Sequence, residues 1–276
     1  MLAVSWLGNS SDDALGAMLF ATIDWNQPWL ARLRHIGEAL AASDDWIKAA
    51  GVLSTERRLS NASGHPIRFI AQQSLPAGIG YESHIAATGE VPTRNNLHDF
   101  FNTLAWLHFP STKCALNTLQ AEAIHHSHSR ETRGPQRDAA TLFDENAAIF
   151  VSYDANLLEA LRAHDWRETL QKTPNAFFSQ AEVILFGHAL IEKLIKPYKS
   201  ITAHVWTMKI DSAWFAISHQ EQQATLDQHL ALMLLEGFDN SAFCHLPVLG
   251  VPGWWHEQDA EFYADTEVFR PKRQHR

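Results

Sequence analysis

Three short pieces of this sequence combine histidine and carboxylate side chains in a way that can bind a metal ion. The pieces are His98-Asp99, Asp144-Glu145, and His188 with Glu192. Imidazole and carboxylate groups together are ligands that Zn, Mn and non-haem Fe bind in proteins. We therefore expect a polar pocket that holds a divalent transition metal (Zn, Mn or Fe). The predicted metal ligands are His98, Asp144, His188 and Glu192.

The spacing of His188 and Glu192 carries the most geometric information. Residues four apart on a helix project to the same side, so this pair can chelate a metal. Alternatively, one member binds the metal and the other acts as a base. A structural interpretation stays open beside this one. In it, His188 packs at a helix start after Gly187, and Glu192 pairs with Lys196 one turn further on.

Other residues are candidates for catalysis and for substrate binding. Asp99 or Glu145 is the predicted general base of the pocket. Arg94 or Arg137 can hold an anionic substrate group through two parallel hydrogen bonds. Trp254, beside a Pro-Gly turn, can line a pocket for a flat ligand, although an aromatic residue there can equally anchor the core.

The pair His98-Asp99 lies in the stretch PTRNNLHDFFNTLAWLHFP, residues 92–110. Its apolar residues recur at three- and four-residue spacing, which predicts an amphipathic helix over 96–108. Asn96 is a suitable N-cap, and Asp99 stands where a carboxylate favours the positive end of the helix dipole. His98 and Asn102 can pair one turn apart. The polar face is therefore consistent either with capping or with a buried site.

The remaining pattern predicts an α+β fold, mainly helical with several short strands, in one domain over 1–276. We expect an irregular lead-in over 1–28, a flexible loop over 127–136 and an aromatic C-terminal wrap over 246–276. The histidines of HHSH at 125–128 belong to a solvated loop in this prediction. Helices are predicted over 28–42, 46–59, 112–125, 137–146, 156–163, 166–170, 187–196 and 221–237. Strands are predicted over 67–72, 81–88, 147–153, 181–186 and 201–210.

Composition limits the class of protein. A hydrophobic content of 46% with 19% charged residues is typical of a globular protein. The net charge of −9 argues against a nucleic-acid partner, since the basic residues gather only in the tail RPKRQHR at 270–276. No apolar run reaches 18 residues, so we expect no membrane span. Two cysteines without CxxC spacing and no signal-peptide pattern favour a cytoplasmic protein.

Several motifs together resemble a known family. The pieces are VPTRNNLHDFFNTLAWLHFP, RDAATLFDEN, FGHALIEKL, ITAH, LPVLGVPGWW and FYADTEVFRP. In this order they are similar to a bacterial family known only as domain of unknown function 3025, and they span Tyr81–Pro271. The loop 125–136 departs most from the family pattern. The resemblance implies a cytosolic protein of this length and no particular chemistry.

The sequence lacks the motifs of several common enzymes. It has no GxSxG, no phosphate-binding P-loop and no GxGxxG. We therefore expect a metal-dependent hydrolase that acts on an anionic small molecule. The alternative is a non-catalytic binding or assembly protein whose polar motifs form a structural hydrogen-bond network.

Overall fold

A four-stranded mixed sheet lies at the centre of the protein. Its strands are β3 (Ala147–Ser152), β4 (Ala181–Leu185), β5 (Thr202–Lys209) and β6 (Cys244–Pro247), in the order β4-β3-β5-β6. The computed structural model describes residues 19–125 and 134–272. β3 pairs antiparallel with β4 and parallel with β5, and β6 is an antiparallel edge strand. Every residue of β3 is buried, as expected of a strand with a neighbour on each side.

The side chains of this sheet alternate between two apolar clusters. On β3, Ala148 and Phe150 belong to the larger cluster, whereas Ile149 and Val151 belong to the smaller one. This two-residue period is the geometry of a strand with both faces covered. Leu230 of the long helix α12 (His219–Glu236) is fully buried in the smaller cluster. The sheet is therefore the wall that both cores share.

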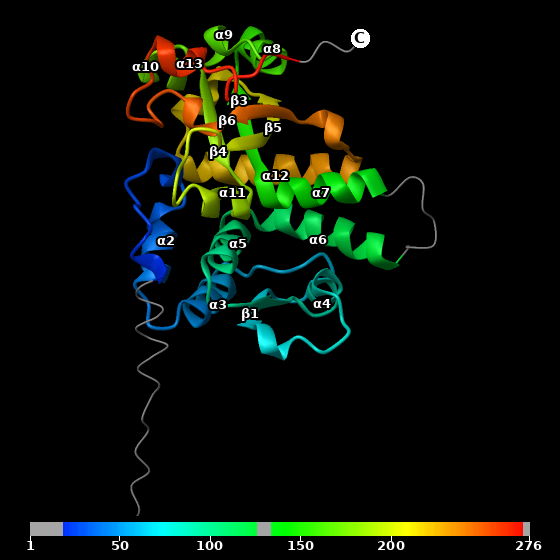
Figure 1. Cartoon of the computed structure of the whole chain (residues 1–276). Helices are drawn as coiled ribbons and strands as arrows, with labels where there is room; N and C mark the ends of the chain where they lie inside the picture. Colours follow the sequence, from blue (N-terminus) through cyan, green and yellow to red (C-terminus); the bar gives the residue numbers. More distant parts are fainter. Residues whose placement is uncertain (1–18, 126–133, 273–276) are drawn as a thin grey trace, which may run out of the picture.

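Helices form most of the remaining chain and pack around this sheet (Figure 1). In Figure 1, α6 (Pro110–His125), α7 (Gly134–Asn146) and α12 run beside one another across the molecule, and α5 (Leu97–His108) stands next to α11 (His188–Lys193). The other α-helices are α2 (Arg34–Ala41), α3 (Trp46–Glu56), α4 (Tyr81–Thr88), α8 (Ala155–Ala163), α9 (Trp166–Leu170), α10 (Pro174–Phe178) and α13 (Ala260–Ala264).

Short elements complete the fold. A second, two-stranded parallel sheet consists of β1 (Arg68–Ala71) and β2 (Glu90–Thr93). The 3-10 helices are η1 (Pro28–Leu30), η2 (Gln72–Ser74), η3 (Ser212–Ala216), η4 (Asn240–Ala242) and η5 (Val248–Gly250).

Helix α5 forms as its sequence predicts. Asn96 is the N-cap, and its side-chain oxygen accepts a hydrogen bond of 2.7 Å from the backbone N–H of Asp99. The apolar stripe is buried, and Phe100 and Leu104 have no exposed surface. Trp106 is also buried, so the helix is covered on more than one side. The polar residues between these positions are therefore held in a largely enclosed setting.

The cap of α5 gives a measurable prediction. We expect Asn96→Ala to lower the free energy of unfolding by about 1 kcal/mol, because one amide at the helix start loses its partner. Asn96→Ser is the control, since serine caps about as well as asparagine. Urea denaturation of the three proteins measures the difference. Equal destabilisation by serine and alanine would show that capping is not the role of this side chain.

Several predicted elements differ from the structure. The stretch 81–88, predicted as a strand, is helix α4, which ends at Gly89 in the left-handed conformation with φ 73°. A glycine there favours a helix C-terminus, and this signal outweighs the strand-like composition. The predicted helix over 28–42 is divided into η1 and α2. Residues 134–136, predicted as loop, begin α7, and 126–133 lie outside the described residues.

The C-terminal segment packs over the body, as predicted. Its aromatic residues belong to the larger apolar cluster, and they are Trp254, Phe262, Tyr263 and Phe269. The Tyr263 hydroxyl donates a hydrogen bond of 2.9 Å to the carbonyl of Gly250. The segment is thus part of the α+β fold, which the structure confirms as mainly helical with small sheets.

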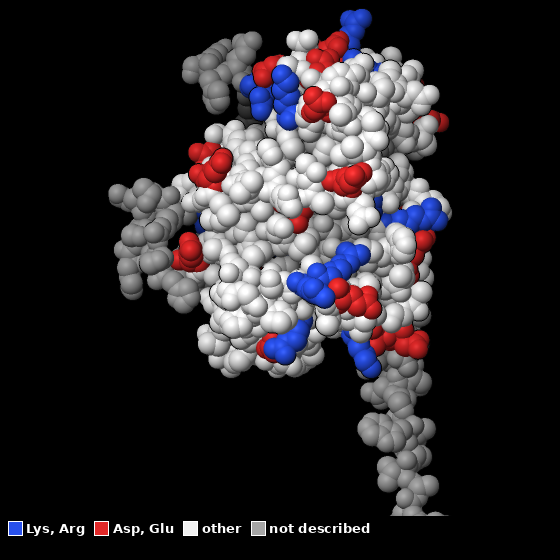
Figure 2. All heavy atoms as spheres, turned by 180° about the vertical axis from the view of Figure 1, so that it is seen from behind, with Lys and Arg blue, Asp and Glu red and all other residues white. Residues whose placement is uncertain are grey.

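The surface carries mixed charges on the face seen from behind. Figure 2 shows Lys and Arg spheres lying next to Asp and Glu there, with no continuous basic surface over that face. Within residues 19–125 and 134–272, no helix combines the length and apolar character needed to cross a membrane.

Candidate metal centre

Three helices bring a pair of histidines and a carboxylate together. Helix α5 carries His98, α7 carries Glu145 near its C-terminus, and α11 begins with His188. The Nε2 atoms of the two histidines are 3.0 Å apart, and His188 Nε2 is 3.5 Å from Glu145 Oε2. One ligand atom from each residue lies within 4.8 Å of the others. Two imidazoles and one carboxylate are the ligand set of many catalytic zinc and non-haem iron sites.

Glu192 orients the first histidine. Its Oε2 atom accepts a hydrogen bond of 3.0 Å from His98 Nδ1. This bond places the proton on Nδ1, which leaves the lone pair of Nε2 directed toward His188 and Glu145. A carboxylate that holds the distal ring nitrogen is the usual support of a metal-binding histidine. The sequence prediction that His188 and Glu192 act on one side of a helix agrees with this arrangement, since both contact His98.

His188 is the buried member of the cluster. It is 4% exposed, and burial lowers its pKa to about 4, although the Asp144 carboxylate favours the charged form. The imidazole is therefore neutral at neutral pH, which is the form that binds metals. Its Nδ1 atom is buried without a hydrogen-bond partner among the described residues, and the nearest carboxylate oxygen, on Asp144, is 3.9 Å away.

Asp144 forms a buried ion pair. Lys113 of α6 donates a hydrogen bond to its Oδ1 atom at 2.5 Å and a second one, of 2.8 Å, to the side-chain carbonyl of Asn102. Burial opposes the charge of Asp144, but Lys113, His188 and His98 together lower the pKa of Asp144. Asp144 is thus a permanent negative charge behind the histidines. Its neighbour Glu145 is half-exposed, and burial and the Asp144 charge raise its pKa.

A cavity of about 200 Å³ adjoins the cluster. Its lining residues come from α4, α6 and α7, and they are Glu82, Gln120, Arg137, Thr141, Asp144 and Glu145. Arg137, Thr141 and Glu145 repeat at four-residue spacing, so they share one face of α7. The cavity therefore places a cationic side chain and a cluster carboxylate along the same wall.

Glu82 lines the same cavity from α4. Asn117 of α6 donates a hydrogen bond of 2.6 Å to its Oε2 atom. Burial raises the pKa of Glu82 to about 7, and the positive charge of Lys113 only partly offsets this effect. A carboxyl group with such a pKa can both accept and release a proton near neutral pH.

Two of the predicted site residues, Arg94 and Asp99, pair with each other. The Arg94 guanidinium donates hydrogen bonds of 3.1 and 3.0 Å to the two oxygens of Asp99, and its backbone N–H donates a third. Asp99 is buried by these contacts at the start of α5. Neither residue belongs to the three-residue cluster or lines the adjoining cavity.

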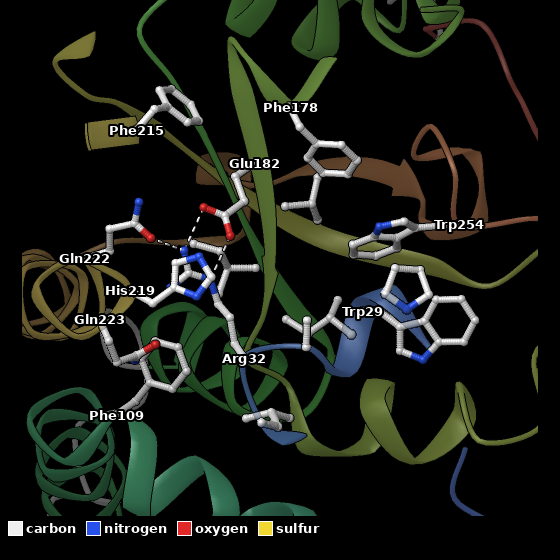
Figure 3. Close-up of a pocket in the computed structure, with 16 residues that line it drawn as sticks. Trp29, Arg32, Phe109, Phe178, Glu182, Phe215, His219, Gln222, Gln223 and Trp254 are labelled. Atoms are coloured by element: carbon white, nitrogen blue, oxygen red, sulfur yellow. Dashed lines mark hydrogen bonds and ion pairs between the residues drawn. The ribbon is translucent and has the colours of Figure 1, made fainter. Parts of the chain in front are cut away.

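Trp254 lies in a different pocket, of about 320 Å³, whose residues Figure 3 displays. Its ring and that of Trp29 are 6.0 Å apart between centroids. In the same pocket Arg32 and Glu182 form a double hydrogen bond, with both distances 2.7 Å, and Gln222 accepts a further one from Arg32 (Figure 3). The charges of this pocket are therefore balanced within the protein.

Four residues near the cluster were missed by the sequence analysis. Lys113 and Asn117 face inward with Gln120 at spacings of four and three residues, and all three are buried. The sequence signal for these residues is their helical spacing, which places three polar side chains on one face of α6. Glu82 was missed for a different reason, because its segment was predicted to be a strand.

Comparison with known proteins adds a family and no named relative. A family model described as "Protein of unknown function (DUF3025)" matches residues 67–273. This range contains the three cluster residues and the cavity beside them. No curated protein and no solved structure matched the chain.

Proposed function

The chain belongs to the DUF3025 family of proteins of unknown function, and from that premise we propose that it is a metal-dependent hydrolase acting on an anionic small molecule. The observation that carries the proposal is the convergence of His98, His188 and Glu145 beside a cavity that contains Arg137. These residues come from three separate helices, so no local sequence constraint forces them together.

The proposed roles follow from the contacts. His98 and His188 would hold the metal through their Nε2 atoms, and Glu145 would hold it through Oε2. Glu192 orients His98 and is not itself a ligand in this assignment, whereas Asp144 neutralises Lys113. A divalent ion held by these three groups would supply Lewis acidity and would lower the pKa of a bound water molecule.

Substrate binding is assigned to the cavity. Arg137 holds an anionic group of the substrate, and Glu82 exchanges a proton with the reacting groups. The reaction takes place in the cytoplasm in this proposal, because Cys114 and Cys244 are unpaired thiols.

The metal content of the purified, tag-free protein tests this function. We expect about one equivalent of a transition metal by elemental analysis, and a near-complete loss in His98→Ala and Glu145→Gln. Both side chains are partly exposed, so these variants are expected to stay folded. Glu192→Gln should lower the metal affinity about 10- to 100-fold, because it weakens the support of His98. His35→Ala, an exposed histidine on α2, is the matched control.

A second function is favoured by one specific contact. The 3.0 Å distance between the two Nε2 atoms is also that of a direct hydrogen bond, which satisfies both Nε2 atoms without a metal. On this alternative, the cluster is a structural network that joins α5 to α11 in a non-catalytic binding protein. Absence of metal in the wild-type protein, even after incubation with Zn, Mn and Fe(II), would favour this alternative and contradict the hydrolase.

A further inference from the structure

We propose that the protein has a second small-molecule site, for a phosphate-bearing anion, in the large pocket between the C-terminal segment and the edge strand β6. This pocket has a volume of about 890 Å³. Its walls include Arg162 of α8, His245 of β6, and Arg270 and Lys272 of the C-terminal segment. It is separate from the metal centre, since the two share no lining residue.

Charge is the first argument for an anion. Three permanent cations line the pocket, and Glu267 is the one carboxylate among the described lining residues. This excess of positive charge contrasts with the net charge of −9 for the whole chain. A concave surface of one sign concentrates ligands of the opposite sign. Phosphate groups, with two negative charges and several acceptor oxygens, match a set of guanidinium and ammonium donors better than a monoanion does.

The cations are available to a ligand. Arg162 donates one hydrogen bond to the Thr207 hydroxyl and another, of 3.2 Å, to Glu159 Oε1, which leaves further N–H groups of its guanidinium without a partner among the described residues. Its side chain is 49% exposed, and that of Arg270 is 68% exposed. Arg270 Nε donates a hydrogen bond of 2.9 Å to the backbone carbonyl of Glu267, and its Nη2 atom lies 3.9 Å from the Glu267 carboxylate. The pocket can therefore bind an anion without breaking a buried ion pair.

The basic C-terminal segment is held in place over the pocket. The carbonyl of Arg270 accepts hydrogen bonds from Trp166 Nε1 at 2.9 Å and from His164 Nδ1 at 3.2 Å. Phe269, one residue earlier, is buried in the larger apolar cluster. These contacts fix the backbone that carries Arg270 and Lys272. A ligand therefore meets positioned charges and orders little of the chain when it binds.

The electrostatic environment of neighbouring groups agrees with this geometry. Burial lowers the pKa of His164, the hydrogen bond to the Arg270 carbonyl opposes this effect, and the neighbouring His245 and Lys272 lower the pKa further. Burial raises the pKa of the Cys244 thiol to about 11, while Arg162 and Lys272 act in the opposite direction. Charges on α8 and on the C-terminal segment thus act on groups that line the same pocket.

Calorimetric titration with inorganic pyrophosphate and with orthophosphate, on metal-depleted protein at fixed ionic strength, tests the proposal. We expect saturable binding of pyrophosphate, tighter than that of orthophosphate. Arg270→Glu and Lys272→Glu should each weaken it about tenfold, because each reverses a charge at the pocket. Lys48→Glu, an exposed residue on α3, is the matched control and should change the affinity less than twofold. Thermal unfolding checks that all variants are folded.

The variant His188→Ala separates this site from the metal centre and should bind pyrophosphate as the wild type does. Loss of binding in His188→Ala, equal weakening by Lys48→Glu, or no saturable binding at millimolar pyrophosphate would each overturn the proposal.

Discussion

Replacing Gly187 by alanine is expected to destabilise the protein by about 3 kcal/mol and to remove metal from the proposed centre. A Cβ atom at this position would lie 2.5 Å from the backbone nitrogens of Asn146 and Ala147. These atoms belong to the junction of α7 and β3, which cannot move as a flexible side chain would. His188 follows Gly187 and Glu145 precedes Asn146, so the substitution separates two residues of the cluster.

Gly51→Ala provides the control for this prediction. Gly51 lies in helix α3, and an added Cβ there meets no atom within 4 Å. Alanine is the better helix former, so Gly51→Ala should be neutral or stabilising by up to about 1 kcal/mol. Urea denaturation gives the free energies of unfolding, and elemental analysis gives the metal content. If Gly187→Ala is as stable as Gly51→Ala, the close approach of α11 to the start of β3 is not required by the fold.

Lys113→Met should destabilise the protein by about 3–5 kcal/mol, because it leaves the Asp144 carboxylate buried without its cation. Lys113 itself is 4% exposed, and its Nζ atom also lies 5.5 Å above the ring of Trp106. Methionine fills the volume of the aliphatic stem, so the loss is mainly electrostatic. The double variant Lys113→Met/Asp144→Leu should recover much of the stability, since it removes both charges together.

The pH dependence of Lys113→Met has a definite sign. In the wild type, Lys113 helps to lower the pKa of Asp144, so the stability from this pair is present above the unfolded pKa and is lost on acidification. Without Lys113, burial raises the pKa of Asp144, and the folded state takes up a proton more readily than the unfolded state. The stability gap between wild type and variant should therefore narrow as the pH falls. Lys172→Met, which breaks an exposed pair with Glu168, should cost at most about 1 kcal/mol with no such narrowing.

Local features of the fold could be predicted from the sequence. Helix α5 was predicted to within one residue, because its apolar spacing and the Asn96 cap agree. The strand β3 was also predicted, since a fully buried strand is a continuous apolar run. The segment 81–88 was predicted wrongly because eight residues with mixed periodicity do not separate a helix from a strand. Its packing against α6 and the turn at Gly89 decide the outcome.

The candidate site was only partly accessible to sequence analysis. The residue types and the four-residue spacing of His188 and Glu192 predicted that these side chains act together. The side chains that His188 and Glu192 contact were not predictable, because these contacts join helices that are distant along the chain. Glu145 lies 3.5 Å from the Nε2 atom of His188, whereas Asp144 pairs with Lys113 and lies 3.9 Å from the Nδ1 atom of His188. The roles assigned to all the candidate site residues remain predictions.

The packing of α11 against α5 and α7 has a consequence for the order of folding. His98 and His188 are 90 residues apart in sequence, whereas α5 and α6 are consecutive. Closing a longer loop costs more chain entropy, so neighbouring helices pair before distant ones. The parallel pairing of β3 with β5 must also form across an intervening stretch of about fifty residues. We therefore expect a partly folded chain to contain its helices but not the histidine cluster, which only the last cooperative step assembles.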